Sequence, residues 1–111
     1  MSLIDRSKQD KIDKRDRRKK ERDFSDVRKV ISSVEGRRLF WRILSHAGLY
    51  KSSFTGNTST YFEEGRRSEG LYWLDELMQS DQKAFAMMQA EHYSEAKSEE
   101  MQRTKEEKNN E

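Results

Sequence analysis

The hydrophobic residues of this chain follow a helical period and are concentrated in its middle. From residue 24 they recur at steps of three and four, as on one face of an amphipathic helix, at Phe24, Val27, Ile31 and Val34. Ser32 and Glu35 then have the spacing of a capping box, which predicts a second helix over about residues 33–47 with Ser32 as its N-cap.

Two further helices are predicted after a polar loop over residues 48–57. Thr60 opens another capping-box pattern, so we expect a third helix that begins near residues 58–60 and ends near residue 79. Asp81 gives the next start signal, for a fourth helix from about residue 81 to about residue 108. These elements and the absence of proline indicate an all-α fold.

The two ends of the chain are charged and have almost no apolar stripe. We therefore divide the chain into a basic arm over residues 1–23, a helical domain over residues 24–93 and a charged helical tail over residues 94–111. The arm is either disordered or a helix that forms only where a partner holds it. The expected architecture is a small bundle of three or four helices with charged helical extensions at both ends.

Charge is distributed unevenly, although the net charge of the chain is only +2. The arm has ten basic and six acidic residues, the domain nine of each, and the tail four basic and six acidic residues. A domain of this size buries only roughly 60% of the surface of its unfolded chain, so we expect partners or oligomerisation to add stability. A basic arm is suited to phosphate backbones or acidic protein surfaces.

Several classes of site have no counterpart in the sequence. The absence of cysteine excludes disulfides, thiolate metal sites and cysteine catalysis. His46 and His92 are the only histidines, and nothing in the pattern brings them together with other ligands. We therefore expect no enzymatic activity, no metal and no cofactor. No apolar run approaches the ~20 residues of a membrane span, so no membrane contact is predicted.

The string Glu-Gly-Arg-Arg occurs twice, at residues 35–38 and 64–67, each time before an aromatic and apolar stretch. Guanidinium groups bind carboxylates or phosphates through paired hydrogen bonds. The arginines either grip phosphates or an acidic partner, or they pair within the domain, with the candidates Glu35, Glu63, Glu64 and Glu69. We assign them to a structural motif that locks the helices and shapes a docking surface, made of Gly36, Arg37, Arg38, Phe54, Gly56, Asn57, Gly65, Arg66 and Arg67.

Gly65 and Gly70 both fall inside the predicted third helix. Each glycine costs about 1 kcal/mol there relative to alanine, so we expect the close approach of another helix to explain them.

Contact with a partner is assigned to the basic run of the arm and to the two tryptophans. Neighbouring aromatic residues on a helix point in different directions, so one of each pair is free to face a partner, where tryptophan is favoured. The arm is solvated, or it contacts DNA or an acidic protein. The candidate contact residues are Lys14, Arg15, Arg17, Arg18, Lys19, Lys20, Trp41 and Trp73.

The central stretch resembles a family of small virion-associated proteins from short-tailed bacteriophages, typified by a Bordetella phage protein. The matching elements cover roughly residues 24–90 and come in the same order: Gly36-Arg37-Arg38, the apolar stretch 39–44, Ser53-Phe54-Thr55-Gly56-Asn57, residues 62–67 with the second Gly-Arg-Arg, and the apolar stretch 71–77.

The resemblance implies a non-enzymatic component of a phage particle, found in the host cytoplasm before assembly. We expect a multi-copy protein that docks at the portal, the head-tail region or the internal core, with other virion proteins and packaged DNA as candidate partners. Two alternatives stay open: an internal protein ejected with the DNA, and a free nucleic-acid-binding or regulatory protein.

Overall fold

The chain folds into four helices, as a computed structural model shows for residues 2–49, 56 and 59–110. They are α1 (Leu3–Val30), α2 (Val34–His46), α3 (Ser59–Ser80) and α4 (Ala84–Asn109). No strand occurs within these described ranges, and the predicted all-α class is confirmed. Phe54 and Asn57 of the predicted motif lie outside the described residues.

The arm and the first apolar stripe form one continuous helix. Ser2 caps α1, accepting a hydrogen bond from the backbone N–H of Asp5 at 3.2 Å, and the helix then runs for 28 residues. The sequence left the arm as disordered or conditionally helical, because it has no apolar face to bury. The segment consists mostly of helix-forming residues, and neither glycine nor proline occurs before Gly36. Nothing in the sequence therefore interrupts the helix along the arm.

The turn between α1 and α2 is set by two small residues. Ser33, not Ser32, is the N-cap of α2, and its hydroxyl accepts from the N–H of Gly36 at 3.0 Å. Ser32 donates instead to the carbonyl of Lys29 at 2.6 Å. A Cβ at Gly36 would fall on the carbonyl oxygen of Val30, so only glycine allows α2 to leave α1 this closely.

The two glycines of α3 have different surroundings. A Cβ at Gly70 would lie 2.6 Å from the Cβ of Ala47, which confirms the predicted close approach of the α2 end. A Cβ at Gly65 would meet nothing within 4 Å, so the same explanation is wrong for Gly65. α4 begins three residues later than predicted, because the Asp81 carboxylate accepts from the N–H of Lys83 at 2.9 Å and holds a turn there.

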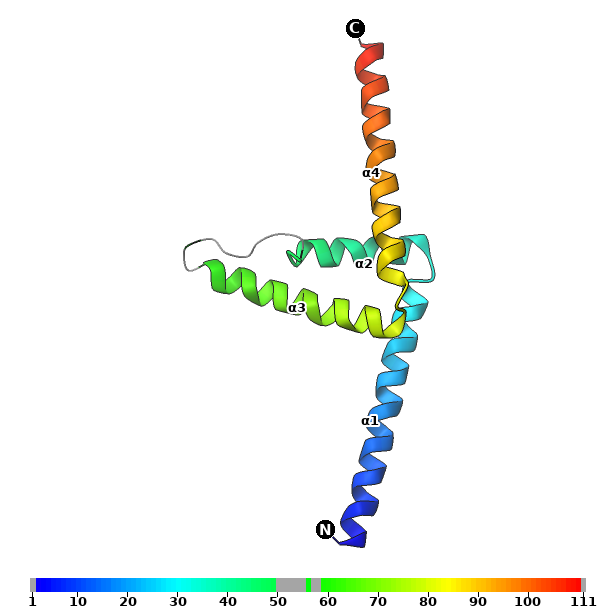
Figure 1. The fold of residues 1–111 in the computed structure, drawn as a ribbon, viewed down its shortest axis with the longest axis vertical. Coiled ribbons are helices and arrows are strands. Elements are labelled where there is room, and N and C mark those ends of the chain that lie inside the picture. Colours follow the sequence, from blue (N-terminus) through cyan, green and yellow to red (C-terminus); the bar gives the residue numbers. More distant parts are fainter. Residues whose placement is uncertain (1, 50–55, 57–58, 111) are drawn as a thin grey trace.

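The molecule is extended, with α1 and α4 projecting in opposite directions from a crosswise pair formed by α2 and α3 (Figure 1). Its extents are 82 × 40 × 15 Å and its radius of gyration is 20.8 Å. A compact domain of this length has a radius of gyration of about 13 Å. The expected compact bundle is therefore corrected: the helices cross at one junction, and the charged extensions continue away from it.

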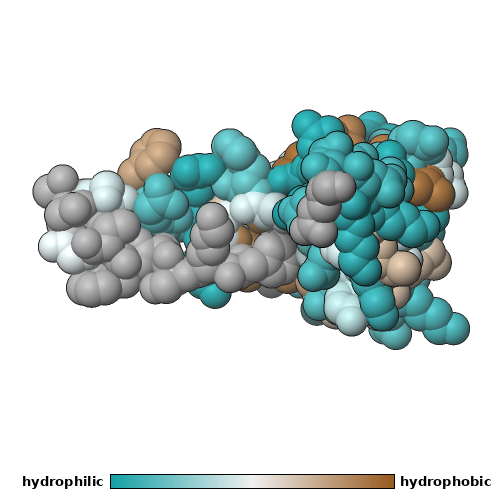
Figure 2. Space-filling view, turned by 90° about the horizontal axis from the view of Figure 1, so that it is seen from above, coloured by the Kyte–Doolittle hydropathy of each residue, from teal (hydrophilic) through white to brown (hydrophobic). Residues whose placement is uncertain are grey.

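The hydrophobic core lies at this junction and draws on all four helices. Its buried members are Val27, Ile31, Phe40, Leu44, Leu77, Ala84 and Met88. Side chains of residues 3–23 and 96–110 are exposed, although neither expected domain boundary coincides with a helix break. Seen from above, hydrophilic residues surround the end of α4, while hydrophobic residues reach the surface in separate patches (Figure 2).

Candidate docking groove and charged arms

An apolar groove lies where α1, α2 and α3 meet. It has a volume of about 630 Å³. The walls are formed by six apolar or aromatic residues and three acidic ones: Val27, Val30, Phe40, Ile43, Tyr72, Trp73, Asp23, Asp26 and Glu76. Helices that cross at a single junction cannot cover all of their apolar faces, so this surface stays open to solvent.

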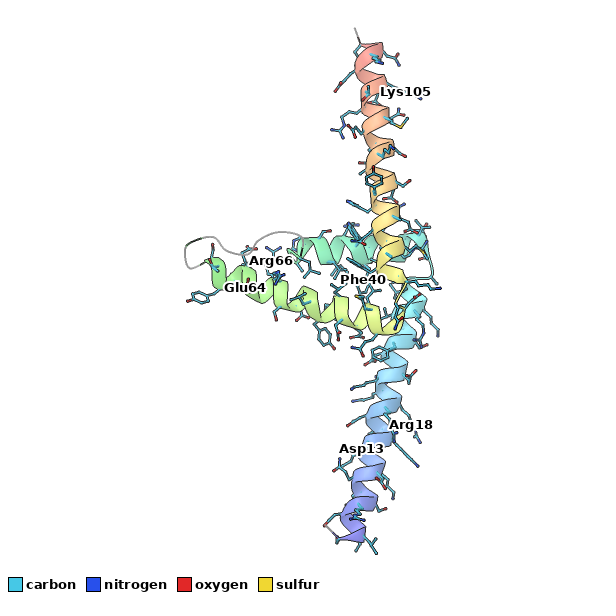
Figure 3. The ribbon with its side chains drawn as sticks, viewed as in Figure 1. Asp13, Arg18, Phe40, Glu64, Arg66 and Lys105 are labelled. Atoms are coloured by element: carbon cyan, nitrogen blue, oxygen red, sulfur yellow. The ribbon has the colours of Figure 1, made fainter. Side chains whose placement is uncertain are left out.

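The floor of the groove is part of the core, and its walls are accessible. Val27 and Phe40 are buried, and Phe40 points from α2 into the space beside α3 (Figure 3). Ile43 and Tyr72 keep 48% and 59% of their surface exposed. Exposed large side chains that are continuous with a buried core are typical of a protein-binding surface.

Two adjacent aromatic residues of α3 hold a defined geometry on the wall. The rings of Tyr72 and Trp73 meet edge to face, with centroids 5.2 Å apart. The indole Nε1 of Trp73 donates to a carboxylate oxygen of Glu69 at 3.1 Å, which fixes the orientation of the ring. An aromatic side chain held in this way binds a partner with a small loss of conformational entropy.

The groove is electrostatically negative. Asp23, Asp26 and Glu76 line it, and no basic side chain of the described residues does. The charge of Glu76, followed by a hydrogen bond to Glu76, burial and the charges of Asp23 and Glu69, raises the pKa of Tyr72 above its ordinary value. The site can therefore bind a segment that presents apolar side chains flanked by basic ones.

The two tryptophans differ in their surroundings. Trp73 lies on the groove, with 37% of its surface exposed. Trp41 packs between α2 and α4, where its ring stacks on Phe85 at 5.8 Å and on His92 at 4.9 Å. Its ring faces are used inside the molecule, and its assignment as a partner contact stays a prediction. The sequence did not single out the groove itself, because its walls come from three separate helices.

The first Gly-Arg-Arg motif ties α2 to α4 and to the end of α1. Arg37 forms a salt bridge with Glu91 at 2.8 Å and donates to the carbonyl of Ile31 at 2.9 Å. The hydrogen bond to Glu91 is the main cause that raises the pKa of Arg37. Arg38 pairs with Glu95 at 3.1 Å. Sequence reasoning missed both acidic partners, although their four-residue spacing on a predicted helix was a usable signal.

The second motif ties α3 to the end of α2. Arg66 donates to the carbonyl of His46, lies 3.3 Å from the Nδ1 atom of the same histidine and pairs with Glu63 at 3.6 Å. It extends from α3 toward α2 (Figure 3). Of the four acidic partners proposed from the sequence, Glu63 is the one in contact. Arg67 has no polar contact with the described residues.

The basic run of the arm is divided between two faces of α1. All six of its basic residues are exposed. Successive helical residues are rotated by about 100°, so Lys14, Arg15, Arg18 and Lys19 share one side, whereas Arg17 and Lys20 lie among acidic residues on the other. Arg18 and Asp13 lie on opposite sides of the arm (Figure 3).

Two further types of site are absent from the described ranges. No group of three or more His, Asp or Glu side chains there is arranged to hold a metal ion. No helix within those ranges is long and apolar enough to cross a membrane.

Comparison with known proteins identifies a family. Neither the curated proteins nor the solved structures give a significant match to this chain. A family model does match, and it covers more than half of the chain, from the last turn of α1 through the first turns of α4. The relationship to phage proteins indicated by the sequence is confirmed. Over residues 27–90, the chain belongs to the family of Bbp19-like phage proteins.

Proposed function

We propose that this protein is a non-enzymatic structural component of a tailed-phage particle, present in several copies. It docks on another virion protein at the portal, the head-tail region or the internal core. The observation that carries this proposal is the apolar groove with an acidic rim between α1, α2 and α3. Membership of a phage protein family supports the phage context.

The groove favours a partner different from itself. A two-fold contact between two copies would bring Asp23, Asp26 and Glu76 of one copy against the same acids of the other, and like charges at an interface are unfavourable. An apolar segment with basic flanks has the complementary character. Tyr72 and Trp73 are the aromatic anchors that such a segment would cover.

A second candidate function is nucleic-acid binding. The basic side of α1 supports it, because exposed lysines and arginines along one helix face attract phosphates. The protein would then act as a free regulatory protein during infection, or leave the particle with the DNA. In either case the groove would not be needed to retain it in the emptied particle.

The proposed function is tested by quantitative mass spectrometry of purified particles before and after DNA release. Retention of the protein in emptied particles, at a copy number that matches a ring, is the expected result. Loss on emptying supports an ejected protein instead. Absence from full particles overturns the structural role and favours a free nucleic-acid-binding protein.

A further inference from the structure

The basic side of α1 contains a regular stripe. Four of its residues follow steps of four, three and four, which keeps them on one helix face: Lys11, Arg15, Arg18 and Arg22. The acidic residues of the arm lie at least about a quarter turn from the centre of this stripe, at Asp5, Asp10, Asp13, Asp16, Glu21 and Asp23, and Arg22 pairs with Asp23 at 3.5 Å. Lys11, Arg15 and Arg18 are exposed and have no polar partner among the described residues.

The far end of the molecule has the complementary stripe. On α4, Glu95, Glu99, Gln102 and Glu106 follow the same steps of four, three and four. Glu95 already holds Arg38, and Glu106 accepts from Gln102 at 3.3 Å. Glu99 has no polar partner among the described residues. Three of the four positions are acidic and the fourth accepts hydrogen bonds, so this face suits a row of cations.

The two stripes have the same length and register. Each spans eleven residue steps, or about 16 Å of helix. Lys11 placed opposite Glu95 brings Arg15 to Glu99 and Arg22 to Glu106. Arg18 then lies opposite Gln102. Three of the four positions then join opposite charges without a change of spacing, and the fourth joins a guanidinium to an amide.

The stripes cannot meet within one molecule, because α1 and α4 project in opposite directions (Figure 1). A second copy shifted along the long axis, and sideways by about 10 Å as for packed helices, has its α1 beside the α4 of the first, with both helices running in the same direction. The contact uses different surfaces on the two copies. Such a contact repeats: it continues as a filament when the copies are only translated, and it closes into a ring when each copy is also rotated by a suitable angle.

We propose that the basic stripe of α1 docks on the acidic stripe of α4 in the next copy, so that copies join head to tail. The inference rests on the multi-copy part of the proposed function, but it uses a surface separate from the groove. Exposed ion pairs are individually weak and are screened by salt, so each junction depends on ionic strength and gains from repetition along the assembly. DNA is the competing occupant of the basic stripe, but it leaves the matching acidic stripe unexplained.

The test uses charge reversal in the purified full-length protein. One variant carries Arg15→Glu and Arg22→Glu, and the other carries Glu99→Lys and Glu106→Lys. At roughly 0.01 M ionic strength, where charges act over about 30 Å, each variant alone sets like charges against each other. Sedimentation velocity should then find assemblies for the wild-type protein and single copies for each variant. An equal mixture should reassemble, because every junction again joins opposite charges.

The matched control is Arg17→Glu with Lys20→Glu, which changes the net charge equally but on the opposite side of α1. This variant should assemble like the wild-type protein. The proposal is overturned if the wild-type protein stays single, if the mixture fails to reassemble, or if the control loses assembly as well. Wild-type assemblies that disperse on nuclease treatment would also overturn it, and would assign the stripe to nucleic acid. None of these readouts depends on phage particles, so they are separable from the test of the groove.

Discussion

At the scale of single residues, the glycine and the arginines of the first Glu-Gly-Arg-Arg string make different contacts from those of the second. Gly36 lets α2 turn back beside the Val30 carbonyl, and Arg37 then reaches across to Glu91. In the second string Gly65 has open space around it, and Arg66 binds the end of α2. The two strings therefore have the same sequence but different structural roles. The glycine of α3 that packs closely against another segment is Gly70.

The two glycines of α3 predict substitutions of opposite sign. Gly70→Ala should lower the free energy of unfolding by roughly 1–3 kcal/mol, because its Cβ overlaps Ala47 and neither backbone can withdraw freely. Gly65→Ala should raise it by about 0.5–1 kcal/mol, because alanine favours the helix and meets nothing. Urea denaturation of both variants measures the difference. Equal effects from the two substitutions would contradict the packing described for α3.

The acidic rim predicts a change in the titration of Tyr72. Glu76 is the carboxylate that raises the pKa of Tyr72 most. Its replacement, Glu76→Gln, should therefore lower the pKa of Tyr72 toward its ordinary value. The raised pKa also makes the free energy of unfolding depend on pH. The stabilisation from Tyr72 is fully present below the pKa of an unfolded tyrosine, and it is lost as the pH rises through the raised pKa of the folded protein. Phenolate absorbance in an alkaline titration, with a Tyr72→Phe variant to identify the signal, measures this shift. An unchanged curve would count against a negative groove.

At the scale of elements, α2 and α4 are joined by charge as well as by apolar packing. Arg37 is the central link, since only 14% of its side chain is exposed and it binds both Glu91 and the carbonyl that ends α1. Arg42 lies on the same helix and is exposed, with no polar partner among the described residues. A comparison of variants at Arg37 and Arg42 therefore distinguishes a structural role of Arg37 from a general effect of removing a positive charge.

Substitution by glutamine should distinguish them. Arg37→Gln should lower the melting temperature by several degrees, because Glu91 loses its partner and the Ile31 carbonyl loses a donor. Arg42→Gln removes the same charge from the same helix and should leave the melting temperature nearly unchanged. Thermal unfolding followed by circular dichroism is the measurement. Similar losses in both variants would show that Arg37 does not lock α2 to α4.

The helices of the domain could be predicted from the sequence, because apolar steps of three and four identify a helix face directly. The continuous helix of the arm could not, because solvated charges leave helix and coil close in free energy. The α4 start was predicted three residues early, since Asp81 caps a turn before the helix. The groove could not be predicted either, because it depends on where Ile43 of α2 lies against Tyr72 of α3.

At the scale of the whole molecule, four helices share one small core and two of them extend far beyond it. The core stabilises the junction, but the charged arms have almost no apolar stripe that could pack against it. The arms are therefore available for contacts with other molecules, and the junction presents the groove.

This shape predicts the solution scattering of the protein. At high ionic strength, where contacts between copies are screened, the radius of gyration should lie close to 20.8 Å. A compact bundle with disordered ends would give a broad distribution of distances, and a fully compact domain would give about 13 Å. Small-angle X-ray scattering separates these cases. A value near that of a compact domain would contradict the opposed arms.

The groove is the centre of this account, and a single charge placed in it tests the account most directly. Ile43→Lys puts a cation on its exposed wall, and Met87→Lys puts the same charge on α4, outside the groove, at a residue of similar exposure. Tyr72→Lys provides a second groove variant if Ile43→Lys does not fold. The measurement is the number of copies per purified particle when the variant is the only source of the protein. We predict a loss of about tenfold or more for the groove variants, as for an interface hot spot, and wild-type numbers for Met87→Lys. Wild-type numbers for a folded groove variant would contradict docking through this surface.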